Sequence, residues 1–80
     1  MFTNRHNGRN NVAGIKVAQI RKGLRISQRE LSDRLQLIGL DIDKNAVQRI
    51  ESGQRFITDI EIGFLAKALG TTVTDLLEIR

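Results

Sequence analysis

The sequence predicts an all-α fold of five short helices. It contains no proline, its aromatic content is only 4%, and glycines follow several apolar segments that have helical spacing. Strands depend on aromatic and β-branched residues, whereas glycine frequently ends a helix. A chain of 80 residues has room for one modest core, so we expect a single folded domain.

The first eleven residues differ from the rest of the chain. They are rich in Asn, Arg and Gly, and Phe2 is their only bulky apolar side chain. Such a segment buries too little surface to order itself. We therefore expect residues 1–11 to form a flexible N-terminal arm and residues 12–80 to form the domain.

The first two helices are predicted between Val12 and Gly39. Apolar and long side chains at the spacing of one helical face indicate the first helix: Val17, Ile20, Arg21 and Leu24. Gly23, with the two residues after Leu24, is expected to close it. Ser27 and Glu30 form a capping box at the start of the second helix. The inward stripe of that helix follows, ahead of Gly39: Leu31, Leu35 and Ile38.

Asp43 is a favourable N-cap for a third helix that Gly53 ends. The inward positions of this helix are Ala46, Val47 and Ile50. A second capping box, Thr58 to Glu61, begins the fourth helix, whose apolar stripe precedes Gly70: Ile62, Leu65, Ala66 and Leu69. The cap signal recurs over residues 72–75 and predicts a short fifth helix with three apolar residues: Val73, Leu76 and Leu77.

The positive charge is concentrated in the first part of the chain, although the net charge is only +4. Residues 1–29 hold seven basic side chains and no acidic one: Arg5, Arg9, Lys16, Arg21, Lys22, Arg25 and Arg29. A one-sided basic segment on a small domain favours a polyanionic partner, most often nucleic acid. The alternative is a basic surface that only contacts solvent.

Several classes of protein are disfavoured. The chain has no cysteine and a single histidine, His6, so it lacks the residues for thiolate or histidine metal sites. No base accompanies its hydroxyl groups, and we expect no catalysis and no cofactor. No apolar run approaches the ~18 residues of a membrane-spanning helix, and no secretory signal is present. The expected compartment is the cytoplasm.

The second helix, a turn and the third helix form the most informative pattern. In helix-turn-helix proteins the second helix of such a pair enters the major groove of DNA. The outward face of the third helix carries only polar residues that can pair with base edges: Lys44, Asn45, Gln48 and Arg49. The alternative interpretation is the ordinary solvated face of an amphipathic helix.

Four runs of residues, in order, resemble the phage repressor/Cro family, also called XRE-type helix-turn-helix domains. They are Ile20–Arg21, Ile26–Leu31, Val47–Gly53 and Leu65–Gly70, and the resemblance extends over residues 14–78. It implies a five-helix domain that binds double-stranded DNA as a homodimer at pseudo-palindromic operators. The implied function is transcription regulation, most often repression.

The resemblance also implies roles for individual residues. Lys44, Asn45 and Arg49 fall on the base-reading positions of the family, and Gln48 lies beside them. The implied phosphate contacts lie at the start of the second helix and in the loop after the third: Gln28, Arg29, Ser52, Gln54 and Arg55. Arg21 and Glu51 match a structural ion pair between the first helix and the end of the third.

The chain departs from the family over residues 36–42, which lengthen the second helix and its turn. The angle between the two helices depends on this segment, so the choice among the four base-reading candidates stays open. A second function is also open, namely a protein-interaction module such as an antitoxin that masks a partner protein. We expect the dimer interface around Val73, Leu76 and Leu77. An exposed apolar surface beyond this dimer patch would favour the interaction module.

Overall fold

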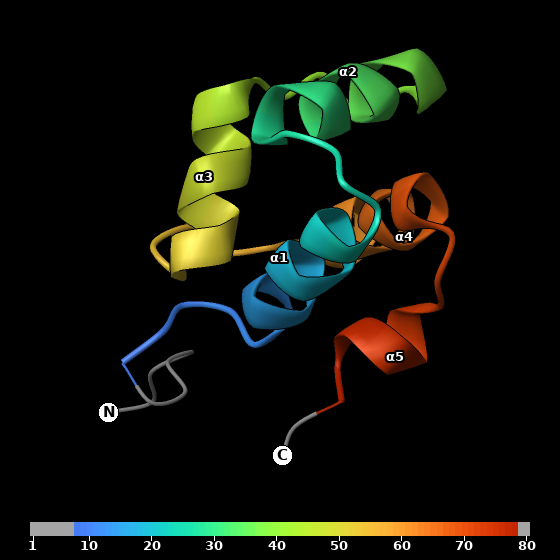
Figure 1. The fold of residues 1–80 in the computed structure, drawn as a ribbon. Helices are drawn as coiled ribbons and strands as arrows, with labels where there is room; N and C mark the ends of the chain where they lie inside the picture. Colours follow the sequence, from blue (N-terminus) through green and yellow to red (C-terminus); the bar gives the residue numbers. More distant parts are fainter. Residues whose placement is uncertain (1–7, 79–80) are drawn as a thin grey trace.

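The computed structural model describes residues 8–78, which form five helices and no strand (Figure 1). The helices are α1 (Ala13–Gly23), α2 (Gln28–Ile38), α3 (Lys44–Ser52), α4 (Asp59–Leu69) and α5 (Val73–Leu76). This confirms the all-α, five-helix prediction. The C-terminal boundary of the domain and residues 1–7 of the expected arm lie outside the described residues.

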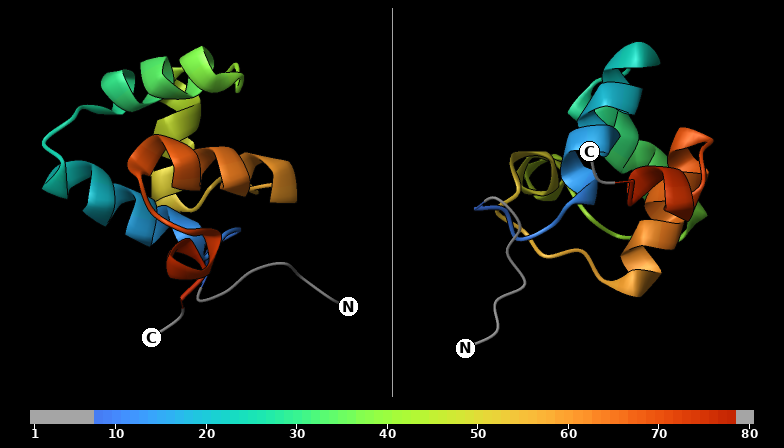
Figure 2. Two further views of the ribbon diagram at one scale, coloured as in Figure 1. Left: turned by 90° about the vertical axis from the view of Figure 1, so that its right-hand side faces the viewer. Right: turned by 90° about the horizontal axis from the view of Figure 1, so that it is seen from below.

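The first four helices surround a common core. α1 packs against α3 and α4, and α2 packs against the same two helices, so the four contacts close a ring. The short α5 covers the edge formed by α1 and α4 (Figures 1 and 2). The largest fully buried side chains come from all five helices: Val17, Leu31, Leu35, Val47, Ile50, Leu65 and Leu76. α3 thus lies at one side of the molecule with its apolar face in the core.

Short-range signals set most helix boundaries. Glu30 N donates to Ser27 Oγ at 3.0 Å, and Ser27 N donates to Glu30 Oε1 at 2.9 Å, so the first capping box is complete. The hydrogen bond from the Ser27 backbone to the Glu30 carboxylate lowers the pKa of Glu30 most, and the Ser27 side chain lowers it further. Helices α2, α3 and α4 end on glycines with positive φ angles, as predicted: Gly39, Gly53 and Gly70.

α1 ends where the sequence predicts. Gly23 is its last residue, and Arg25, with φ of 60°, is the left-handed residue that turns the chain. One inward position differs from the prediction. Leu24, expected on the inward face of this helix, is 45% exposed because it already belongs to this turn.

The segment before α1 is attached to the domain. Asn10 and Asn11, which we expected in a flexible arm, donate hydrogen bonds to backbone carbonyl groups in residues 50–55. Asn11 is only 8% exposed, and its Oδ1 accepts from Gly14 N at 2.7 Å. This bond caps the start of α1, where the N-cap residue Val12 has no side chain that can do so.

Candidate nucleic-acid interface

A tight turn over residues 39–43 joins α2 to α3. Gly39 turns the chain with φ of 114°, and Gln36 Nε2 donates to Ile42 O at 3.0 Å across the turn. Ile42 is buried, and Asp43 Oδ1 then accepts from Ala46 N at 2.8 Å to begin α3. The additional residues over 36–42 therefore complete α2 and form an ordered turn. After this turn, α3 runs at a steep angle to α2 (Figure 1).

α3 has one buried and one exposed face. Ala46, Val47 and Ile50 are at most 7% exposed and anchor the helix to the core. The four base-reading candidates lie together on the exposed face: Lys44, Asn45, Gln48 and Arg49. Within residues 8–78 no hydrogen bond or ion pair holds any of these four side chains. Their donors and acceptors are available to a ligand.

The C-terminal part of α3 is fixed to α1 through Glu51. Arg21 Nε donates to Glu51 Oε2 at 2.6 Å, and Arg21 Nη2 donates to Oε1 at 3.0 Å. The two side chains are 11% and 8% exposed. The hydrogen bond from Arg21 to Glu51 raises the pKa of the guanidinium despite the opposing effect of burial. The expected ion pair is therefore present, and it ties the exposed helix to the scaffold.

Gln28, expected to contact phosphate, belongs to the same cluster. Its Nε2 donates to Glu51 Oε1 at 3.1 Å, and the side chain is half-buried. An amide nitrogen has a second hydrogen, so one donor of Gln28 is still available for a phosphate. No local pattern in the sequence indicates this contact between Gln28 and Glu51.

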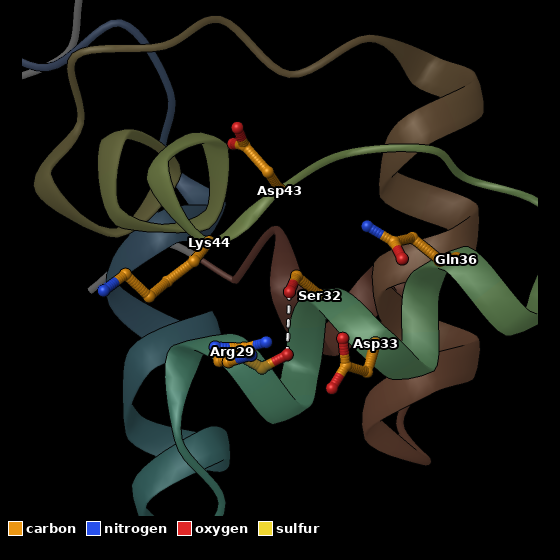
Figure 3. A pocket seen from close by; sticks show the side chains of 6 residues that line it. All are labelled: Arg29, Ser32, Asp33, Gln36, Asp43 and Lys44. Atoms are coloured by element: carbon orange, nitrogen blue, oxygen red, sulfur yellow. Dashed lines mark hydrogen bonds between the residues drawn. The ribbon is translucent and has the colours of Figure 1, made fainter.

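Arg29 and Lys44 both line a polar hollow of about 350 Å³ between α2 and the start of α3 (Figure 3). Asp33 and Gln36 lie toward its other end in this view. Ser32 Oγ donates to Arg29 O at 2.7 Å, a bond that occupies the hydroxyl within α2. Two exposed cations from adjacent helices thus line the same hollow, together with the carboxylates of Asp33 and Asp43.

The last residue of α3 and the loop after it hold the other three phosphate candidates. Ser52 and Gln54 are exposed, although Ser52 Oγ donates to Arg49 O at 3.2 Å. Arg55 is different, because its Nη1 and Nη2 donate to the two carboxylate oxygens of Glu61 at 3.0 and 2.9 Å. Burial acts to raise the pKa of Glu61, but the hydrogen bonds from Arg55 and Thr58 outweigh it and leave the pKa below its ordinary value. Arg55 is consequently a partly neutralised cation.

Sequence reasoning missed Arg9 and Asn11 as parts of this region. Arg9 Nη2 donates to Glu51 O at 2.7 Å, and Asn11 Nδ2 donates to Ile50 O at 3.0 Å. An asparagine three residues before Gly14 is a cap signal that would have drawn attention to position 11. Arg9 carries no comparable local signal.

Not all of the basic side chains in residues 1–29 are available to contact DNA. Arg9 and Arg21 are bound to protein groups, and Arg5 lies outside the described residues. The remaining four side chains of that segment are at least partly exposed: Lys16, Lys22, Arg25 and Arg29. Over residues 8–78, no group of three or more acidic or histidine side chains could hold a metal ion, and no helix is long and apolar enough to cross a membrane.

Residues 17–76 match the family described as helix-turn-helix. Among solved structures, the chain is similar to a hypothetical transcription factor, NHTF, from Neisseria. The TM-score is 0.72 at 28% sequence identity, over 84% of this chain and 71% of that one. No curated protein matches the chain.

Proposed function

Because the chain belongs to the phage repressor/Cro-like (XRE-type) helix-turn-helix family and is a DNA-binding regulator, we propose that it is a sequence-specific transcriptional repressor. It binds a pseudo-palindromic operator as a homodimer and acts by occupying the site. A regulator of this class acts where the DNA lies, so the cytoplasm is the proposed compartment.

The observation that carries the proposal is the outward face of α3. Four exposed polar side chains, unbound within the described residues, project from a helix whose other face is fully packed. Arginine and lysine pair with guanine O6 and N7, and asparagine and glutamine pair with adenine N6 and N7. Because the helix is fixed by the core and by Glu51, these groups are presented in one orientation.

Phosphate contacts would position the domain on the duplex. Arg29 from α2 stands beside Lys44 from α3, and both are exposed. Ser52 at the end of α3 and Gln54 in the loop after it offer further polar groups. Arg55 can contribute only the donors that Glu61 leaves unused. Such contacts set register and orientation but carry no sequence information themselves.

Dimerisation is expected because the recognition helix of one domain contacts only a short stretch of DNA. One helix reads too few base pairs for useful specificity, and two related half-sites lie about 34 Å apart on one face of DNA. The expected interface around α5 needs a correction, because Leu76 is fully buried in the core. Val73 and Leu77, 37% and 44% exposed, are the residues of this patch that remain available.

A second candidate function is a protein-interaction module of the antitoxin type. Large apolar side chains are exposed away from α5: Leu37 is 86% exposed and Ile60 is 69% exposed. Exposed apolar side chains indicate a contact surface where they form a contiguous patch, and Leu37 and Ile60 are the residues around which such a patch is to be sought. A stable complex with a second protein that abolishes DNA binding would favour this function.

Selection of bound duplexes from a random pool tests the proposal. We expect enrichment of an inverted repeat, and a selected duplex that binds at least a thousandfold more tightly than random DNA at physiological salt, about the lower end for specific regulators. Equal affinity for selected and random duplexes would contradict a sequence-specific repressor.

A further inference from the structure

The residues just before α1 lie on the C-terminal end of α3. Arg9 Nη2 donates to Glu51 O at 2.7 Å and to Ile50 O at 3.4 Å, and Asn11 Nδ2 donates to Ile50 O at 3.0 Å. The last carbonyl groups of a helix have no partner within it. Arg9 provides a partner for Glu51 O, and Asn11 adds a further donor to Ile50 O, which also accepts from Gly53 N. The positive charge of Arg9 also suits the negative end of the helix dipole.

The same segment holds the loop after α3. Asn10 N donates to Gly53 O at 2.8 Å, and Asn10 Nδ2 donates to Gln54 O at 2.9 Å. Asn11 Nδ2 also donates to Arg55 O at 2.7 Å. We call residues 9–11 the clamp, because they bind backbone carbonyl groups on both sides of the point where α3 ends.

Two glycines allow this close approach. A Cβ atom on Gly14 would lie only 2.0 Å from Ile50 O, so the start of α1 touches the end of α3 through backbone alone. A Cβ atom on Gly53 would lie 2.7 Å from Arg9 Cζ, and the φ of +82° there also favours glycine. Only glycine therefore leaves room for the Ile50 carbonyl group at position 14 and for the Arg9 side chain at position 53.

We propose that Arg9 and Asn11 are positioning residues of the DNA interface. They hold the end of α3 and the 53–55 loop in the orientation that base reading requires. The inference rests on the proposed function, since it assigns a role within the same interface. Neither residue belongs to the outward face of α3. Arg9 acts through the carbonyl groups of Ile50 and Glu51, and Asn11 acts through those of Ile50 and Arg55.

The clamp is expected to affect specificity more than general affinity. Base contacts require hydrogen-bond geometry, whereas attraction to the phosphates acts over a Debye length of about 8 Å and tolerates small displacements. Without the clamp, the last turn of α3 and the loop lose their backbone hydrogen bonds to the segment before α1 and can open locally, while the side chains of Glu51 and Arg55 keep their ion pairs. Arg49 and Ser52 lie in that last turn.

The test compares Asn11→Ala and Arg9→Lys with the wild-type protein. Asn11→Ala changes no charge, and Arg9→Lys keeps the charge while it removes the planar guanidinium. The measured quantity is the ratio of dissociation constants for random and selected duplexes, taken by fluorescence anisotropy well below every melting temperature. Arg34→Lys is the matched control, because Arg34 Nη1 donates to Ala68 O at 3.3 Å near the end of α4, away from α3 and from the proposed dimer patch.

We expect Asn11→Ala to reduce the ratio about tenfold, the value of one specific base contact, with an unchanged slope of log K against log salt. Arg9→Lys should reduce the ratio severalfold. If Asn11→Ala does not fold, the Arg9→Lys variant decides whether the clamp affects specificity. Arg34→Lys should keep the wild-type ratio. Amide hydrogen exchange over residues 53–55 should accelerate only in the two clamp variants.

The failures are distinguishable. A wild-type protein without preference for any duplex overturns the proposed function and this inference with it. A wild-type preference that every folded clamp variant retains overturns the inference alone. An equal loss of the ratio in Arg34→Lys also overturns it, because the effect would then not depend on where the arginine–carbonyl bond lies.

Discussion

Arg21 and Glu51 form a two-point ion pair that joins α1 to α3, with Nε–Oε2 and Nη2–Oε1 distances of 2.6 and 3.0 Å. Arg21 Nη1 also donates to Ile26 O at 2.8 Å, in the turn that leads to α2. A single guanidinium therefore connects the three helices that build the interface. The pair fixes how far the recognition helix stands from its scaffold.

Glu51→Ala should destabilise the fold by about 2–3 kcal/mol, less than the ~3–5 kcal/mol of a fully buried pair because both side chains keep slight exposure. The loss arises because Arg21 remains desolvated without its partner. Thermal or urea unfolding measures it. Glu51→Gln retains an acceptor and should lose less, and a Glu51→Ala protein as stable as the wild type would contradict this role.

DNA affinity should fall with salt. Each neutralised phosphate contributes about −0.9 to the slope of log K against log salt. Arg29→Gln should therefore make the slope less negative by about that amount, because Arg29 is an exposed cation beside Lys44. Lys67→Gln, an exposed cation on α4, is the matched control and should leave the slope unchanged. Binding that is equal at low and physiological salt would contradict the electrostatic part of the account.

Stability should depend on the ionisation of Glu61. Its pKa in the folded protein is below the ordinary 4.5, so folding favours the charged form. The contribution is present at neutral pH and is lost as the pH falls below about 4.5. Melting temperatures between pH 7 and 3 should thus decline less in Glu61→Gln than in the wild type. Asp41→Asn, at an exposed position, should follow the wild-type curve.

The homodimer should depend on the exposed part of α5. Leu77→Asp places a charge in the proposed interface and should shift sedimentation equilibrium toward monomer. Leu37→Asp is the control, because Leu37 is 86% exposed on α2 and lies outside that patch. A wild-type protein that is monomeric both free and on DNA would remove the dimer from the account.

The helices could be predicted because their signals are local. Ser27 and Glu30 identify a helix start from three residues apart, and the glycines at 39, 53 and 70 identify three ends. The two faces of α3 followed from the same spacing. The Arg21–Glu51 pair joins residues 30 apart in sequence, and only a resemblance to known proteins suggested it.

The clamp could not be predicted because its bonds join distant parts of the chain. Asn11 meets Ile50 and Arg55 across 39 and 44 residues, and no periodic pattern relates these positions. The burial of Leu76 beside an exposed Leu77 likewise depends on how α5 rests on α1 and α4. Arg55 was assigned to phosphate by analogy, and its pairing with Glu61 became visible only in three dimensions.

The central claim is that the outward face of α3 reads bases, and Arg49 tests it most directly. The measurement is the binding of wild-type and Arg49→Ala protein to the selected duplex and to every single-base variant of one half-site. The account predicts a loss of about 1–3 kcal/mol on the selected duplex and a relaxed preference at one base pair per half-site, with the melting temperature unchanged. An equal proportional loss on selected and random DNA would show that Arg49 contacts phosphate only, and would contradict the claim.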